Sequence, residues 1–268
     1  MFISSGDSQL FTLAFGAKTA PAFLTLSGWI GSWEDWADTF SVMSENWRTI
    51  SYDHRGSGST LTPLESITFD NLVADVFTVM DAHGIERCVL GAMSMGAAVA
   101  IAAVLQQPQR FSGLVIVNGA HHRDTPSVGD PFFQLLQHNH AQALARFINS
   151  CVPEKDAEPI KHWGRQILER ATPEAAQRLY QTVSPVDLRP ELGRLTLPTL
   201  ILHGDADPLV SVQSARALAQ ALPNAKLVLL PGAGHVPIMT RPHSVAQEIN
   251  AFFAPSCFSP SESAPASS

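Results

Sequence analysis

Cysteine is scarce in this sequence. Among 268 residues there are three cysteines, Cys88, Cys151 and Cys257, and they lie far apart. An odd number of widely spaced cysteines indicates neither a disulfide framework nor a cysteine-based zinc site. We therefore expect a fold held together by its apolar core, in a reducing compartment such as the cytoplasm.

Charged residues are also few, and basic residues are the minority among them. Asp, Glu, Lys and Arg together make up 15% of the chain, and 17 basic against 24 acidic residues give a net charge of −7. No cluster of basic residues is present, whereas proteins that bind nucleic acids usually carry one. We therefore expect no nucleic-acid partner.

Long apolar segments are missing as well. No run of about 18 apolar residues occurs, so we expect no membrane-spanning helix and no membrane partner. The first ten residues, MFISSGDSQL, contain no basic residue, and Asp7 interrupts the stretch that would be apolar in a signal peptide. Hydrophobic residues nevertheless make up 45% of the chain, which excludes wholesale disorder.

Short apolar segments alternate with helical patterns along most of the chain. The predicted strands are Gln9–Ala14, Ala22–Ser27, Arg48–Tyr52, Cys88–Ala92, Gly113–Asn118, Pro198–His203 and Lys226–Leu230. The predicted helices are Phe69–His83, Met95–Gln106, Val212–Ala221 and Pro242–Phe253. This alternation predicts an α/β fold with an open, mostly parallel sheet flanked by helices.

The region between residues 131 and 192 interrupts this alternation. Its pattern is helical only, and prolines divide it into short pieces. We predict a small helical cap there, inserted over the end of the sheet where ligand sites form. The predicted division is a core of residues 1–130 and 193–254, a cap of residues 131–192 and a disordered Ser/Pro-rich tail of residues 255–268.

Ser94 stands between a predicted strand and a predicted helix, in the segment Ala92-Met93-Ser94-Met95-Gly96. A serine in such a tight strand-to-helix turn has a strained backbone and a hydroxyl exposed above the sheet. Its neighbours must be small, because strand and helix approach closely there. A lone serine at a helix start is more commonly an N-cap, so a catalytic interpretation requires partners elsewhere.

Two later segments offer such partners. His235 lies in a Gly-rich loop after the last predicted strand, where its ring can reach the edge of the sheet. Asp205 and Asp207 follow the strand Pro198–His203, and a carboxylate at a strand end can accept a hydrogen bond from a histidine Nδ1–H. A turn residue is the competing interpretation of either aspartate, and an exposed bystander that of the histidine.

The order of Ser94, Asp207 and His235, together with two early loops, resembles the α/β-hydrolase family. The resemblance covers about Gln9 to Phe253. It rests on five motifs, which are S-G-W at residues 27–29, D-H-R-G-S-G-S at 53–59, A-M-S-M-G at 92–96, H-G-D-A-D at 203–207 and G-A-G-H at 232–235. The chain looks most similar to members with a helical cap, such as 3-oxoadipate enol-lactonases and carboxylesterases.

The resemblance implies a catalytic triad. Ser94 would be the nucleophile and His235 the general base, and the family pattern selects Asp207 over Asp205 as the acid. One departure is Ala92, which replaces the first glycine of the G-x-S-x-G motif.

The resemblance also implies an oxyanion hole, formed by the backbone N–H groups of Trp29 and Met95. Gly28, beside Trp29, lets the backbone approach a substrate. Ser27 departs from the family pattern, because it replaces a histidine that often braces this loop. The loop that contains Asp53 and Arg55 is expected to hold in place the loop that begins with Ser27, Gly28 and Trp29, called the oxyanion loop below.

Further candidate binding residues lie outside these motifs. His121 and His122 follow a predicted strand, and they either line the substrate site or are exposed loop residues. Trp163, in the predicted cap, is a candidate substrate-binding residue. No carboxylate or cysteine stands at ligand spacing from the histidines, so no metal site is predicted.

The residues and the resemblance together imply a serine hydrolase that cleaves an ester, a lactone or a similar acyl bond through an acyl-enzyme. We expect no cofactor, a small-molecule substrate, and a monomer or homodimer. The fold hosts other chemistries, so a carbon–carbon hydrolase, a lyase, a cofactor-free oxygenase and a slowly turning ligand receptor remain alternatives. Multiple turnover of a generic ester separates the enzyme from the receptor.

Overall fold

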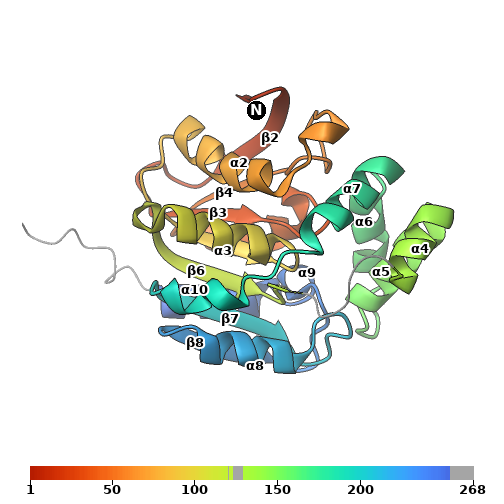
Figure 1. Ribbon diagram of the computed structural model, residues 1–268. Coiled ribbons are helices and arrows are strands. Elements are labelled where there is room, and N and C mark those ends of the chain that lie inside the picture. Colours follow the sequence, from red (N-terminus) through yellow and green to blue (C-terminus); the bar gives the residue numbers. More distant parts are fainter. Residues whose placement is uncertain (120, 123–128, 254–268) are drawn as a thin grey trace, which may run out of the picture.

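An eight-stranded sheet forms the centre of the computed structural model, which describes residues 1–119, 121–122 and 129–253 (Figure 1). Its strands are β1 (Phe2–Ser5), β2 (Ser8–Phe15), β3 (Ala22–Leu26), β4 (Arg48–Tyr52), β5 (Cys88–Met93), β6 (Phe111–Val117), β7 (Thr199–Gly204) and β8 (Ala225–Leu230). The spatial order is β1-β2-β4-β3-β5-β6-β7-β8. Only the pairings made by β2 are antiparallel among these strands, which confirms the predicted open, mostly parallel sheet.

The predicted strands correspond to β2 through β8, with ends that differ by one or two residues. The strand β1 was not predicted, because it is four residues long and only one of its residues is buried. It forms a hairpin with β2, pairing Ser5 with Ser8. A strand this short carries too little alternation to be distinguished from a loop.

Helices cover both faces of the sheet. In Figure 1, α2, α3 and α8 lie in front of the sheet, whereas α10, which packs against α1, lies behind it. The helices of this core are α1 (Ala37–Met43), α2 (Phe69–Ala82), α3 (Gly96–Gln106), α8 (Val212–Ala221), α9 (Pro237–Thr240) and α10 (Pro242–Phe252). The sequence pattern missed α1 and α9, which are seven and four residues long.

Four helices stand together beyond one end of the sheet (Figure 1). They are α4 (Pro131–His138), α5 (His140–Cys151), α6 (Glu158–Leu168) and α7 (Pro173–Val183), and they lie between β6 and β7 in the chain. They fall where the cap is predicted, and the term cap below denotes residues 131–192. The predicted tail, residues 255–268, lies outside the described residues. None of the described helices is both long and apolar enough to cross a membrane.

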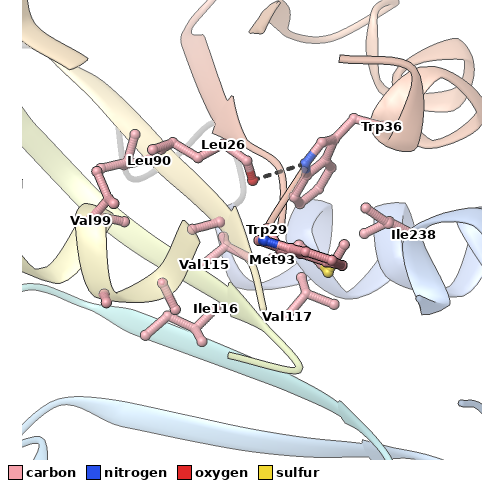
Figure 2. Packing of buried hydrophobic residues seen from close by; sticks show 14 of the residues in the cluster. Leu26, Trp29, Trp36, Leu90, Met93, Val99, Val115, Ile116, Val117 and Ile238 are labelled. Atoms are coloured by element: carbon pink, nitrogen blue, oxygen red, sulfur yellow. Dashed lines mark hydrogen bonds between the residues drawn. The ribbon is translucent and has the colours of Figure 1, made fainter. Parts of the chain in front are cut away.

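The central strands are buried along their whole length. Figure 2 shows Leu90 of β5 and Ile116 of β6 in one cluster of buried hydrophobic residues with Val99 of α3. Because helices cover both faces of these strands, almost every residue in them is apolar. Polar groups are confined to the strand ends, where the chain leaves the core, and the candidate site lies there.

Candidate active site

Ser94 occupies a strained turn directly after β5. Its backbone φ is 53°, in the left-handed region that a side chain other than glycine seldom adopts. Its N–H donates to the carbonyl of Val117 at 3.0 Å, which holds the turn against the end of β6. A Cβ at Gly96 would lie 2.5 Å from the carbonyl oxygen of Ser27, so glycine lets α3 begin this close to β3. The motif therefore has the geometry of a nucleophile elbow.

The structure brings the three predicted triad side chains together. His235 Nε2 lies 2.8 Å from Ser94 Oγ, and His235 Nδ1 lies 2.8 Å from Asp207 Oδ2. Asp207 follows β7, and His235 follows β8, so adjacent parallel strands deliver both groups to the same edge. With Asp207 accepting from Nδ1–H, the Nε2 atom is free to take the proton of Ser94.

Asn118 is a further member of this cluster that the sequence analysis did not single out. Its Nδ2 donates to Asp207 Oδ2 at 2.6 Å and to the carbonyl of Gly234 at 3.2 Å, and its Oδ1 accepts from the N–H of Gly204 at 3.2 Å. The Asn118 side chain thus connects Asp207 to the loop that carries Gly234 and His235, called the histidine loop below. The sequence did contain a signal for Asn118, because it is the one polar residue of the predicted strand Gly113–Asn118 and stands at its end.

The environment of Asp207 favours its charged form. Burial opposes ionisation, but hydrogen bonds from His235 and Asn118 bring the pKa of Asp207 below its ordinary value. Its Oδ1 also accepts from the N–H of Leu209 at 2.8 Å. Nearby His203 donates from Nε2 to the carbonyl of Val210 at 2.9 Å, and burial lowers the pKa of His203. A neutral His203 does not form an ion pair with Asp207, so the carboxylate charge acts on His235.

Trp29 and Met95, the residues predicted to form an oxyanion hole, both lie next to Ser94 or its cavity. Trp29 follows β3 and lines the same cavity as Ser94, and Met95 directly follows the serine. Neither backbone N–H donates a hydrogen bond to any residue that the structure describes. The indole of Trp29 donates from Nε1 to the carbonyl of Ala176 at 2.8 Å and meets the ring of Phe147 edge to face. The cap therefore anchors this residue.

Another histidine braces the oxyanion loop where Ser27 departs from the family pattern. His54 Nε2 donates to the carbonyl of Gly28 at 3.0 Å. Ser27 itself donates to the carbonyl of Ser32 at 2.6 Å, which holds the far side of the same loop. Asp53 accepts from the N–H of Trp33 at 2.8 Å, in agreement with the supporting role expected of its loop.

A buried ion pair between Arg55 and Asp75 stabilises the loop that follows β4. Arg55 Nε and Nη2 lie 2.7 and 2.9 Å from the two carboxylate oxygens of Asp75, whose side chain is fully buried. Arg55 Nη2 also donates to the carbonyl of Ser5 at 3.0 Å. The guanidinium thus connects the N-terminal hairpin, α2 and the loop after β4.

Replacement of Asp75 by alanine should lower the free energy of unfolding by about 3–5 kcal/mol, because it leaves the buried Arg55 charge without its buried partner, and the half-exposed Asp7, 3.4 Å from Nη1, compensates it weakly. Urea denaturation followed by circular dichroism measures this change. Asp81→Ala is the matched control, since the Asp81 partner of Arg110 is 67% exposed and such surface pairs contribute little. Equal losses in the two variants would contradict a special role for the buried pair.

An apolar cavity opens beside Ser94 and His235. Its empty space, including the part open to solvent, is about 410 Å³. Its walls come from both the core and the cap, and they include Gly28, Trp29, Met93, Phe147, Ile148 and Leu168. The predicted substrate-binding residue Gly28 therefore lies at the cavity.

The other two predicted substrate-binding residues lie elsewhere. Trp163 is 42% exposed and does not line the cavity, because α6 turns the next residue, Gly164, toward it instead. His121 is buried and its ring packs against that of His122, but neither is among the cavity-lining residues. Among the described residues, no group of three or more His, Cys, Asp or Glu is arranged to hold a metal ion.

The cap also holds the histidine loop directly. The N–H of His235 donates to the carbonyl of Cys151 at 2.8 Å, and the N–H of Gly234 donates to Glu154 Oε1 at 2.8 Å. Thr240 Oγ1 donates to the same Glu154 oxygen at 2.8 Å. Residues 151–154, at the end of α5 and directly after it, thus fix the backbone that carries the proposed base.

Comparison with known proteins identifies the family. Residues 31–240 match the family model described as serine aminopeptidase, S33. This chain belongs to the S33 family of α/β-hydrolases. The match spans both the core and the cap, and it includes Ser94, Asp207 and His235.

Individual relatives are distant but cover more than four fifths of the chain. The protein of Pseudomonas savastanoi pv. phaseolicola named "Putative carbamate hydrolase RutD" is 27% identical over 83% of this chain and 90% of its own length. The pimeloyl-[acyl-carrier protein] methyl ester esterase of Nitrosomonas europaea is 28% identical over 83% of this chain and 91% of its own.

A solved structure shows the same fold. The enol-lactonase from Burkholderia xenovorans superposes with a TM-score of 0.87 at 23% identity, covering 94% of this chain and 99% of that one. Together with the family match, these relatives show that the protein is a hydrolase of the α/β-hydrolase type.

Proposed function

We propose that this protein is a serine hydrolase that cleaves a carboxylic ester, a lactone or a related acyl bond of a small molecule through an acyl-enzyme. The observation that carries the proposal is the continuous chain of contacts from Ser94 Oγ through His235 to Asp207, with both contacts at 2.8 Å. A strained elbow that presents a hydroxyl to a base has no packing advantage, and a nucleophile requires it.

The chemistry follows from this geometry. His235 Nε2 removes the proton of Ser94 as Oγ attacks the carbonyl carbon, and the backbone N–H groups of Trp29 and Met95 stabilise the resulting oxyanion. His235 then gives that proton to the leaving alcohol oxygen as the carbon–oxygen bond breaks. In the second half, His235 takes a proton from water, the hydroxide attacks the acyl carbon, and Ser94 recovers its proton as the acid leaves.

The cavity indicates the kind of substrate. Most of its walls are apolar, so an aliphatic or aromatic acyl or alcohol group fits it better than a highly charged one. The named activities of the relatives, on a methyl ester and on a carbamate, are both acyl-transfer reactions to water and agree with this class.

Labelling with a fluorophosphonate tests the proposal without knowledge of the substrate. We expect one adduct per chain in the intact mass of the parent protein and none in Ser94→Ala, because only an activated serine reacts at this centre. A generic ester then distinguishes a catalyst, which turns over many times, from a slow receptor. A folded parent protein that remains unlabelled would contradict the proposal.

A further inference from the structure

A carboxyl group lies on the wall of the cavity, apart from the triad. Asp35 belongs to the short 3-10 helix Trp33–Trp36, is 6% exposed, and lines the same cavity as Ser94 and His235. It is the one carboxylate among the described residues that line this cavity. The mechanism above gives it no role, since Asp207 already serves His235.

The turn that carries Asp35 is held on both sides. Trp36 is fully buried and donates from Nε1 to the carbonyl of Leu26 at 3.2 Å, as Figure 2 shows. The N–H of Trp33 donates to Asp53 Oδ1 at 2.8 Å. These contacts fix the position of Asp35 before a substrate binds, so the carboxyl is preorganised.

The carboxyl lies against the oxyanion loop. A Cβ at Gly31 would lie 2.1 Å from Asp35 Oδ2, so the carboxyl occupies the space a side chain there would take. The Ser27 Cβ lies beside the same position, 3.2 Å from it, and the Ser27 hydroxyl donates to the carbonyl of Ser32 at 2.6 Å. The single proton of this hydroxyl is therefore engaged with the backbone.

The surrounding charges do not compensate a negative charge on Asp35. Arg170 pairs with the neighbouring Glu34, with Nη2 2.8 Å from Oε1, and no described cation forms an ion pair with Asp35. Burial raises the pKa of Asp35 to about 7; the nearby Ser27 hydroxyl opposes the rise, and the charges of Asp53 and Glu34 add to it. In either form, a carboxyl oxygen remains an acceptor for a hydrogen bond.

Local structure alone does not require a carboxyl here. Ser32 already caps the turn, and a buried carboxyl costs free energy that an apolar side chain on this wall would avoid. We infer that Asp35 forms a polar subsite of the cavity that accepts a hydrogen bond from a hydroxyl or amide group of the substrate. This inference rests on the proposed hydrolase function and narrows its substrate class.

Matched ester pairs test the subsite on both sides of the scissile bond. One pair compares 4-nitrophenyl hexanoate with its hydroxylated counterparts, and the other compares hexyl acetate with hydroxyhexyl acetates. We expect Asp35→Leu to lower kcat/KM for the hydroxylated member of at least one pair by about 10- to 100-fold relative to its plain partner. Asp35→Asn, which keeps an acceptor oxygen, should retain the parent ratio within about threefold.

Asp38→Leu is the matched control, because it makes the same replacement at an exposed position three residues along the chain. It should leave all ratios unchanged, and Asp35→Ala replaces the leucine variant if that variant does not fold. The inference is overturned if the parent hydrolyses the esters but the ratios are the same in every folded Asp35 variant. Failure of the proposed function looks different, because the parent protein would then hydrolyse none of the esters.

Discussion

Ser94→Ala should lower kcat for ester hydrolysis by about 10⁶-fold, the size of loss measured when a triad nucleophile is removed from a serine hydrolase. The triad acts as a unit, so His235 and Asp207 without their nucleophile contribute almost nothing. The oxyanion donors and the cavity remain, and they should preserve a residual rate about 10³- to 10⁴-fold above that of water. Release of 4-nitrophenol from a butyrate ester measures both rates.

A second serine provides the control for this experiment. Ser41 lies on the exposed face of α1, where its hydroxyl donates to the carbonyl of Asp38. Ser41→Ala should therefore retain the parent kcat. An active Ser94→Ala protein, with kcat within tenfold of the parent, would show that the reaction does not pass through this hydroxyl.

Asp207→Asn should lower kcat by about 10⁴-fold while the protein keeps its fold. The amide preserves the shape of the carboxylate but removes its charge, and its Nδ2 donor faces the Nδ1 atom of His235. The imidazole then carries its proton on Nε2, which is the wrong atom for taking the proton of Ser94. The loss should appear in kcat more than in KM, because the histidine acts in the transition state.

Asp205 is the natural comparison for Asp207, since the sequence alone offers both. Asp205 Oδ1 accepts from the N–H of Gly232 at 2.7 Å and supports a turn away from the histidine ring. Asp205→Asn keeps an acceptor oxygen at that position, so kcat should change by no more than a few-fold. Comparable losses in the two variants would argue that the aspartates act by holding loops rather than by orienting His235.

The fold could be predicted largely from local pattern. Strands buried on both faces must be apolar throughout, and that requirement marked β5, β6 and β7 clearly. The same logic located Ser94, because a polar residue in a small-residue turn between two apolar elements is conspicuous. The short elements β1 and α9 have no comparable signal, and they depend on what packs against them.

The supporting residues of the site could not be predicted in this way. Asn118 and Glu154 act through contacts with residues 89 and 80 positions away in the chain, respectively. Asp35 is of interest because it is buried in the cavity wall, and the local sequence pattern does not predict the burial of a carboxyl group by tertiary packing. The reverse holds for Trp163, since an aromatic residue in a cap suggested a binding role that its position on the outer side of α6 does not support.

The contacts between residues 151–154 and the histidine loop bear on how the protein can be altered. Here Cys151 and Glu154 bind the backbone beside His235, and Ala176 anchors the indole of Trp29. We therefore expect a chimera that carries the cap of a relative to lose turnover on every ester, unless it restores these acceptor atoms. Selectivity and rate are encoded in the same segment, and they will evolve together.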